Sequence, residues 1–69
     1  KQAALIKAIE AAGGATALGL ALRISQEAVS QWRRVPAARV LDVERVTGIS
    51  RHELRPDIYP VEPKIQAAE

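Results

Sequence analysis

Two short segments with helical periodicity, separated by no more than three residues, constrain the fold of this chain most strongly. Leu18 and Leu22 are four residues apart in the first segment, and Val29 and Trp32 are three apart in the second. Residues three or four apart share one face of a helix, so each segment has an apolar stripe. The spacing therefore predicts two short helices that pack against each other across a tight turn.

Capping residues and helix breakers predict three further helices around this pair. Gly13 and Gly48 follow apolar segments, and glycine accepts the left-handed conformation that a helix C-terminus needs. Pro56 stops another helix, and Thr16 and Ser25 are N-cap candidates for the central pair. The predicted fold is all-α, with five short helices over residues 2–12, 16–22, 26–33, 36–47 and 50–55.

The chain has 69 residues and is expected to form one domain, over residues 1–59. Residues 60–69 contain Pro60 and Pro63 and no apolar cluster, which predicts an irregular C-terminal tail. The alternative for residues 57–61 is a short strand. Two prolines flank this stretch, and they would confine such a strand to the edge of a sheet.

Composition excludes several kinds of site. The chain has no cysteine and one histidine, His52, so it offers neither a disulfide nor a set of zinc ligands, and His52 is expected at the surface or in a cap. A chain this short without an evident pocket is not expected to be an enzyme or to bind a cofactor. No apolar run approaches the ~18 residues of a membrane span, and we expect a cytoplasmic protein.

Positive charge is concentrated in the middle of the chain. The net charge is +2, but residues 23–39 alone carry +3, with Arg33 at the end of the predicted helix over residues 26–33 and Arg34 and Arg39 after it. Such a cluster is typical of a surface that contacts phosphates. Considered by itself, the charge pattern fits a solvated helix face equally well.

The predicted helix over residues 26–33 also has a polar face, formed by Gln26, Glu27, Ser30 and Gln31. These side chains can hydrogen-bond to base edges in a DNA major groove. Glu27 would repel phosphates but can accept a hydrogen bond from cytosine N4. A solvated face is the alternative, but the position of this helix after a tight turn and before two arginines favours base recognition.

Residues 15–32 resemble the helix-turn-helix of Cro/CI-type repressors, and residues 8–14 and 48–60 resemble the YdaS-like, Cro-like group more narrowly. That group comprises prophage-encoded repressors and some proteins described as antitoxins. The resemblance covers residues 4–60. It implies a transcriptional repressor that binds a palindromic operator in double-stranded DNA as a homodimer.

The resemblance also assigns roles to particular residues. Base contacts are implied for Gln26, Glu27 and Gln31, with Ser30 near the groove wall. Phosphate contacts are implied for Thr16, Arg33, Arg34 and Arg39. Trp32 is implied to pack in the core.

Two residues have structural consequences that can be checked directly. Arg23 stands in the turn where the family usually has glycine, and we expect it to adopt a positive φ angle. Glu44 lies between Val40 and Leu41 on the apolar side of its helix, so we expect it to be partly buried and paired with an arginine from the third or fifth helix.

Other functions remain compatible with the sequence. An antitoxin-like module could bind a toxin protein through its C-terminal part. A purely structural helical domain would fit the composition, but it would leave the polar face of the helix over residues 26–33 unexplained. Retardation of a palindromic duplex that is lost at high salt would separate DNA binding from both alternatives.

Overall fold

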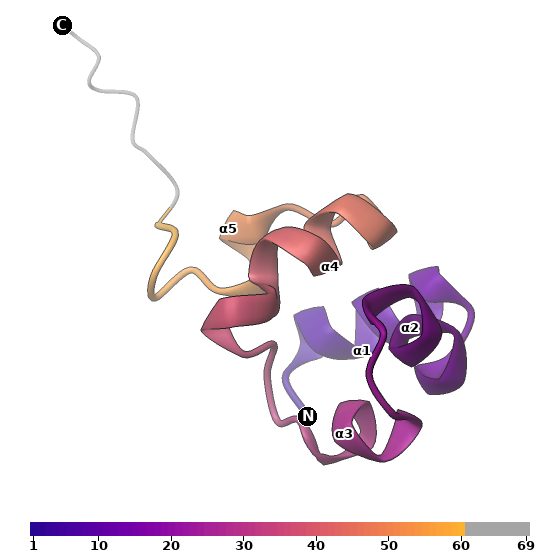
Figure 1. Ribbon diagram of the computed structural model, residues 1–69. Helices are drawn as coiled ribbons and strands as arrows, with labels where there is room; N and C mark the ends of the chain where they lie inside the picture. Colours follow the sequence, from indigo (N-terminus) through magenta and orange to yellow (C-terminus); the bar gives the residue numbers. More distant parts are fainter. Residues whose placement is uncertain (61–69) are drawn as a thin grey trace, which may run out of the picture.

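The computed structural model describes residues 1–60, which form an all-helical domain (Figure 1). The α-helices are α1 (Ala3–Ala12), α2 (Ala15–Leu22), α3 (Gln26–Gln31), α4 (Val40–Thr47) and α5 (Arg51–Leu54), with a 3-10 turn, η1 (Ala37–Arg39), before α4. Residues 1–60 contain no strand, so the predicted all-α class with five short helices is confirmed.

Two glycines connect α1 to α2. The backbone N–H groups of Gly13 and Gly14 donate to the carbonyl oxygens of Glu10 and Ile9 at 3.1 and 2.8 Å, which closes the last turn of α1. Gly14 is the N-cap of α2, and its carbonyl accepts the N–H of Leu18 at 3.0 Å. The prediction of Thr16 as the N-cap is therefore wrong, because α2 begins before it.

The core lies where the five helices meet. Each helix contributes at least one fully buried side chain, namely Leu5, Leu18, Val29, Val43 and Leu54 in chain order. The complete set of buried apolar residues is Ala4, Leu5, Ala8, Leu18, Leu22, Val29, Val35, Val40, Val43, Ile49 and Leu54. Burial of this continuous apolar cluster holds together helices that are too short to be stable alone.

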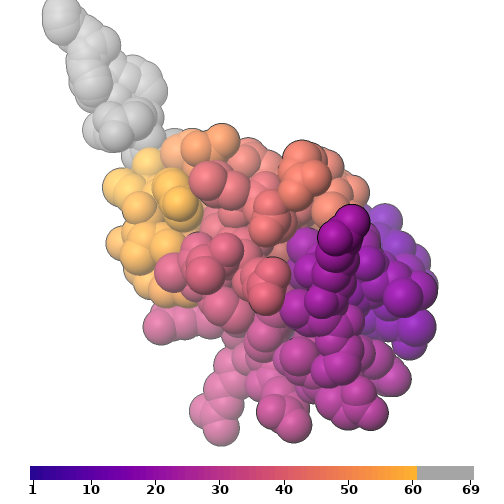
Figure 2. Space-filling model, in the orientation of Figure 1, coloured from indigo at the N-terminus to yellow at the C-terminus, as the bar shows by residue number. Residues whose placement is uncertain are grey.

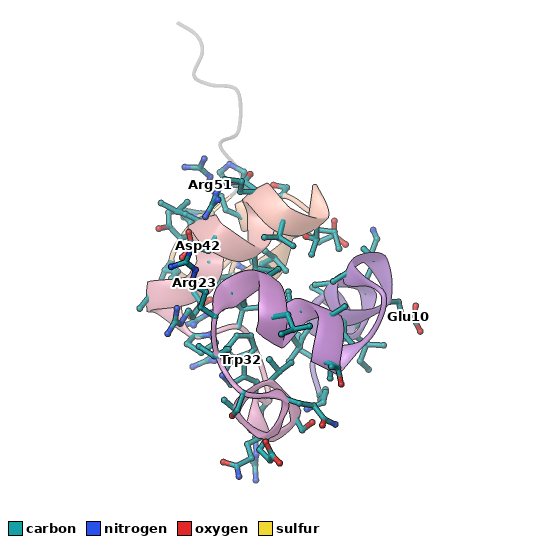
Figure 3. All side chains as sticks on the ribbon, turned by 45° about the vertical axis from the view of Figure 1, so that its right-hand side comes forward. Glu10, Arg23, Trp32, Asp42 and Arg51 are labelled. Atoms are coloured by element: carbon teal, nitrogen blue, oxygen red, sulfur yellow. The ribbon has the colours of Figure 1, made fainter. Side chains whose placement is uncertain are left out.

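Trp32 lies at the edge of this core. It is half-buried and packs against the buried cluster, in agreement with its predicted core role. In Figure 3, Trp32 lies between α3 and the body of the domain, whereas Glu10 points outward from α1.

The connection from α3 to α4 differs from the prediction at both ends. α3 ends at Gln31, two residues earlier than expected, because Trp32 has extended backbone angles. Pro36 is also extended and stands just before η1, where its carbonyl accepts the N–H of Arg39 at 2.8 Å. The predicted single helix over residues 36–47 is thus a 3-10 turn followed by α4.

Glu44 joins α4 to α5, as predicted. Its side chain is 29% exposed, and Oε1 accepts a hydrogen bond from Nε of Arg51 at 3.0 Å. Oε2 lies 3.3 Å from the backbone N–H of Arg51, at the start of α5. Glu44 therefore both forms an ion pair and satisfies an otherwise unpaired backbone donor at a helix N-terminus.

The chain turns back after α5. The N–H groups of Ile58 and Tyr59 both donate to the carbonyl of Arg55, at 3.2 and 2.8 Å, so residues 56–58 form a turn, and the described part of the alternative strand, residues 57–60, is not a strand. His52, expected at the surface or in a cap, is half-buried; its backbone N–H donates to Oγ of the N-cap Ser50 at 3.0 Å, and its Nδ1 lies 2.9 Å from the carbonyl oxygen of Tyr59. Most of the predicted tail, residues 61–69, lies outside the described residues.

Within residues 1–60, no single helix has the length and apolar composition needed to cross a membrane. α1 and α2 meet these criteria only as a pair, and the pair is bent by 81° at the two glycines.

Candidate nucleic-acid interface

Three residues form the turn between α2 and α3. Arg23 has a φ angle of 62°, which confirms the positive φ predicted from the sequence. The N–H groups of Arg23 and Ile24 donate to the carbonyls of Leu20 and Gly19, at 3.2 and 2.9 Å. This pair of bonds ends α2 with a left-handed residue and reverses the chain within one turn.

Gly19 allows the turn to fold closely against α2. A Cβ at this position would lie 2.8 Å from the carbonyl oxygen of Ile24 and 3.3 Å from backbone atoms of Ser25. The close approach at Gly19 is thus made to the turn and to the N-cap of α3. The absence of a side chain at this position sets the angle at which α3 leaves α2.

Replacement of Arg23 by glycine is expected to raise the melting temperature. A non-glycine residue in the left-handed region is strained by roughly 1 kcal/mol relative to glycine, which corresponds to about 4–8 °C for a domain of this size. Thermal unfolding followed by circular dichroism measures the change. An unchanged or lower melting temperature would mean that the Arg23 side chain makes a stabilising contact that offsets the strain.

α3 has only six residues and is held at both ends. At its start, the Ser25 side chain accepts the N–H of Ala28 at 3.1 Å, as expected of an N-cap. At its end, the Lys1 ammonium donates to the carbonyls of Ser30 and Trp32. A cation at a helix C-terminus also interacts favourably with the helix dipole.

The face of α3 opposite the core is polar and exposed. Val29 is buried beneath this face. The four residues predicted to contact bases are all exposed, namely Gln26, Glu27, Ser30 and Gln31. In Figure 2 the magenta segment that includes α3 forms the lower end of the molecule, and side chains project from it.

The residues predicted to contact phosphates lie on α2, on η1 and in the connection that follows α3. Arg33 and Arg34 are exposed and follow α3 after Trp32, and the carbonyl of Arg33 accepts the N–H of Gln2 at 2.7 Å. Thr16 is exposed on the first turn of α2, and Arg39 is half-buried in η1. Two of these four candidates, Arg33 and Arg34, thus lie within three residues of the end of α3 in the chain.

Sequence reasoning missed a network that supports this segment from the other side. Arg55 is only 7% exposed, and its guanidinium donates to the carbonyl of Val35 at 2.8 Å. The same guanidinium donates to both carboxylate oxygens of Asp57, at 2.9 and 2.7 Å. The only signal in the sequence was an arginine beside the buried Leu54, with an aspartate two residues later.

The hydrogen bonds from Arg55 lower the pKa of Asp57 to about 2. A carboxylate whose pKa is lower in the folded than in the unfolded state stabilises the fold above its unfolded value. We therefore expect Asp57 to stabilise the domain above about pH 4 and to lose this effect as the pH falls toward 2. Melting temperatures measured from pH 7 to pH 2 should converge for the wild type and Asp57→Asn. Parallel curves would contradict this role.

Within residues 1–60, no three histidine, aspartate or glutamate side chains are grouped so that they could hold a metal ion. The side chains that the interface offers are hydrogen-bonding groups on α3 and guanidinium groups beside it.

Together, the tight turn, the capped α3 and its exposed polar face define a helix-turn-helix domain. The chain belongs to the family described as bacterial toxin YdaS, whose model matches residues 5–63. It is also similar to the solved structure of the Cro protein from the putative prophage element Xfaso 1 in Xylella fastidiosa strain Ann-1. The two are 42% identical and superpose with a TM-score of 0.80, over 87% of this chain and 100% of that chain. No curated protein matches this sequence.

Proposed function

We propose that this protein binds double-stranded DNA sequence-specifically and represses transcription as a homodimer on a palindromic operator, in the cytoplasm. The observation that carries the proposal is the exposed polar face of α3, followed at once by Arg33 and Arg34. Residues of these types supply base contacts and phosphate contacts, respectively, in helix-turn-helix complexes. The similarity to a Cro protein supports the same function.

The proposed mechanism is occupancy of the operator. A two-fold dimer would insert two copies of α3 into successive major grooves, about 34 Å apart. The first turn of α3, which contains Gln26 and Glu27, would enter the groove, and Arg33 and Arg34 would lie toward the backbone. A dimer bound in this way would prevent RNA polymerase from using an overlapping promoter.

DNA binding by this protein is expected to depend steeply on salt. If two protomers together contact about six phosphates, log K should fall with log salt at a slope of about −5, because bound counterions are released. Mobility-shift titrations with a palindromic duplex selected from a random pool, at several salt concentrations, measure the slope. Absence of binding at low salt, or a flat salt dependence, would contradict the proposed function.

The second candidate is an antitoxin-like protein-interaction role, within the toxin–antitoxin setting that the description of the matching family, bacterial toxin, suggests. In this role the C-terminal part would bind a toxin protein, and α3 would have no need to recognise bases. The same titration separates the two roles, since a protein-interaction module would not bind the selected duplex more tightly than random DNA.

A further inference from the structure

Arg33 and Arg34 are neighbours, but their surroundings differ. Nη1 of Arg34 lies 3.7 Å from Oδ2 of Asp57, and the Arg34 side chain is 60% exposed. Arg33 is exposed and forms no ion pair within residues 1–60. A phosphate that approaches Arg34 therefore approaches the Asp57 carboxylate as well. A phosphate that approaches Arg33 finds no carboxylate of residues 1–60 paired with that arginine.

The position of the Asp57 carboxylate does not depend on Arg34. Both of its oxygens accept hydrogen bonds from Arg55, whose side chain is 9% exposed and is itself fixed to the carbonyl of Val35. The exposed Arg34 side chain can rotate away, but Asp57 stays where Arg55 holds it. Its low pKa also keeps it ionised throughout the physiological pH range.

We propose that Asp57 is a fixed counter-charge that weakens the binding of DNA phosphates by Arg34. This inference rests on the proposed function. To bind a phosphate, Arg34 must either hold it a few ångströms from the Asp57 carboxylate or rotate away and give up its pairing with Asp57. At such distances the repulsion between two unit charges changes affinity severalfold even in water. Arg33 and Arg34 are thus unequal contributors to DNA binding.

The substitution Asp57→Asn tests the proposal. We expect binding of a random-sequence duplex at low salt to become about fivefold tighter per protomer, because the negative charge is removed. The same variant should melt at a lower temperature, because the buried Arg55 loses its ion pair. If Asp57 had a structural role only, DNA affinity and melting temperature would fall together, which would overturn the proposal.

Glu53→Gln is the matched control. It removes the same charge from a side chain of nearly equal exposure, 45% against 47% for Asp57, and its ion-pair partner is Lys7 of α1. The control should change affinity for random DNA less than Asp57→Asn does. Equal gains in the two variants would mean that net charge is the cause, and the proposal would fail.

A double-mutant cycle assigns the effect to Arg34. When Arg34→Ala is already present, Asp57→Asn should lose most of its gain in affinity, because the arginine that it releases is missing. A full gain in that background would overturn the link between the two residues.

A further comparison does not require a change at Asp57 and so does not depend on the folding of that variant. Arg33→Ala should weaken binding to random DNA more than Arg34→Ala does, because only Arg34 gives up a partner. An equal or larger loss for Arg34→Ala would contradict the proposal.

If the wild-type protein binds no duplex at low salt, both the proposed function and this inference are wrong. If the wild type binds but these comparisons fail, only the inference about Asp57 falls.

Discussion

Gly19→Ala is expected to destabilise the domain by about 2 kcal/mol, although it places the best helix former inside a helix. In an open helix this change would stabilise by about 1 kcal/mol. Here the added methyl group would lie 2.8 Å from the carbonyl oxygen of Ile24. The atom that it meets belongs to the backbone of the turn, so the contact cannot be relieved by a side-chain rotation. The turn and the start of α3 must move instead.

Chemical denaturation of the wild type and Gly19→Ala measures this loss. Ala21→Gly is a suitable companion, since Ala21 is exposed on the same helix and the change reports the helix-propensity effect alone, about 1 kcal/mol. Because Gly19→Ala also displaces the start of α3, we expect it to weaken binding to the preferred operator. A variant as stable as the wild type would show that the turn can shift at a cost no larger than the gain in helix propensity, about 1 kcal/mol.

Gln26→Ala is expected to weaken binding to the preferred operator by about 5-fold to 150-fold per half-site, and to leave binding to random DNA nearly unchanged. Gln26 is exposed on the first turn of α3, the end that enters the groove in this motif. A glutamine amide can donate to N7 and accept from N6 of adenine, and such a bidentate contact discriminates between bases by about 1–3 kcal/mol.

The matched change is Arg33→Ala, which removes a charge and no base contact. It should weaken binding to all sequences alike and make the salt slope shallower by about one unit per lost phosphate contact. Equal losses on operator and random DNA after Gln26→Ala would mean that α3 does not recognise bases.

Gln31 lies at the other end of α3. It points about 140° away from Gln26 around the helix, with Glu27 and Ser30 between the two.

The sequence was sufficient for the features that depend on local chemistry. Glycine and serine positions fixed the helix boundaries at Gly13, Ser25 and Gly48, and the position of Arg23 in the turn indicated its positive φ angle. Helical periodicity was enough to place Glu44 at the edge of the core, where an isolated charge needs a partner.

The errors arise where two candidates compete or where distant segments meet. Thr16 is a better N-cap by residue type, but Gly14 already supplies the carbonyl that begins α2. The pairing of Arg55 with the Val35 carbonyl joins residues 20 apart, and no periodicity reports such a contact. The candidate base-contacting residues are exposed, as are the phosphate-contacting candidates except the half-buried Arg39, and the roles of all of them stay predictions.

The link between α3 and the first two residues has a consequence for local unfolding. Lys1 and Gln2 occupy the carbonyls of Ser30, Trp32 and Arg33, about 30 positions further along the chain. When these contacts open, the carbonyl of Ser30 in the last turn of α3 and the carbonyls of Trp32 and Arg33 just after it lose their partners, while the core around Leu5 and Leu54 stays closed. In native-state hydrogen exchange, the amides of α3 should therefore exchange through a low-energy opening that leaves α1 protected. The C-terminal end of the helix proposed to recognise DNA is thus held by Lys1 and Gln2, two residues that lie outside any helix.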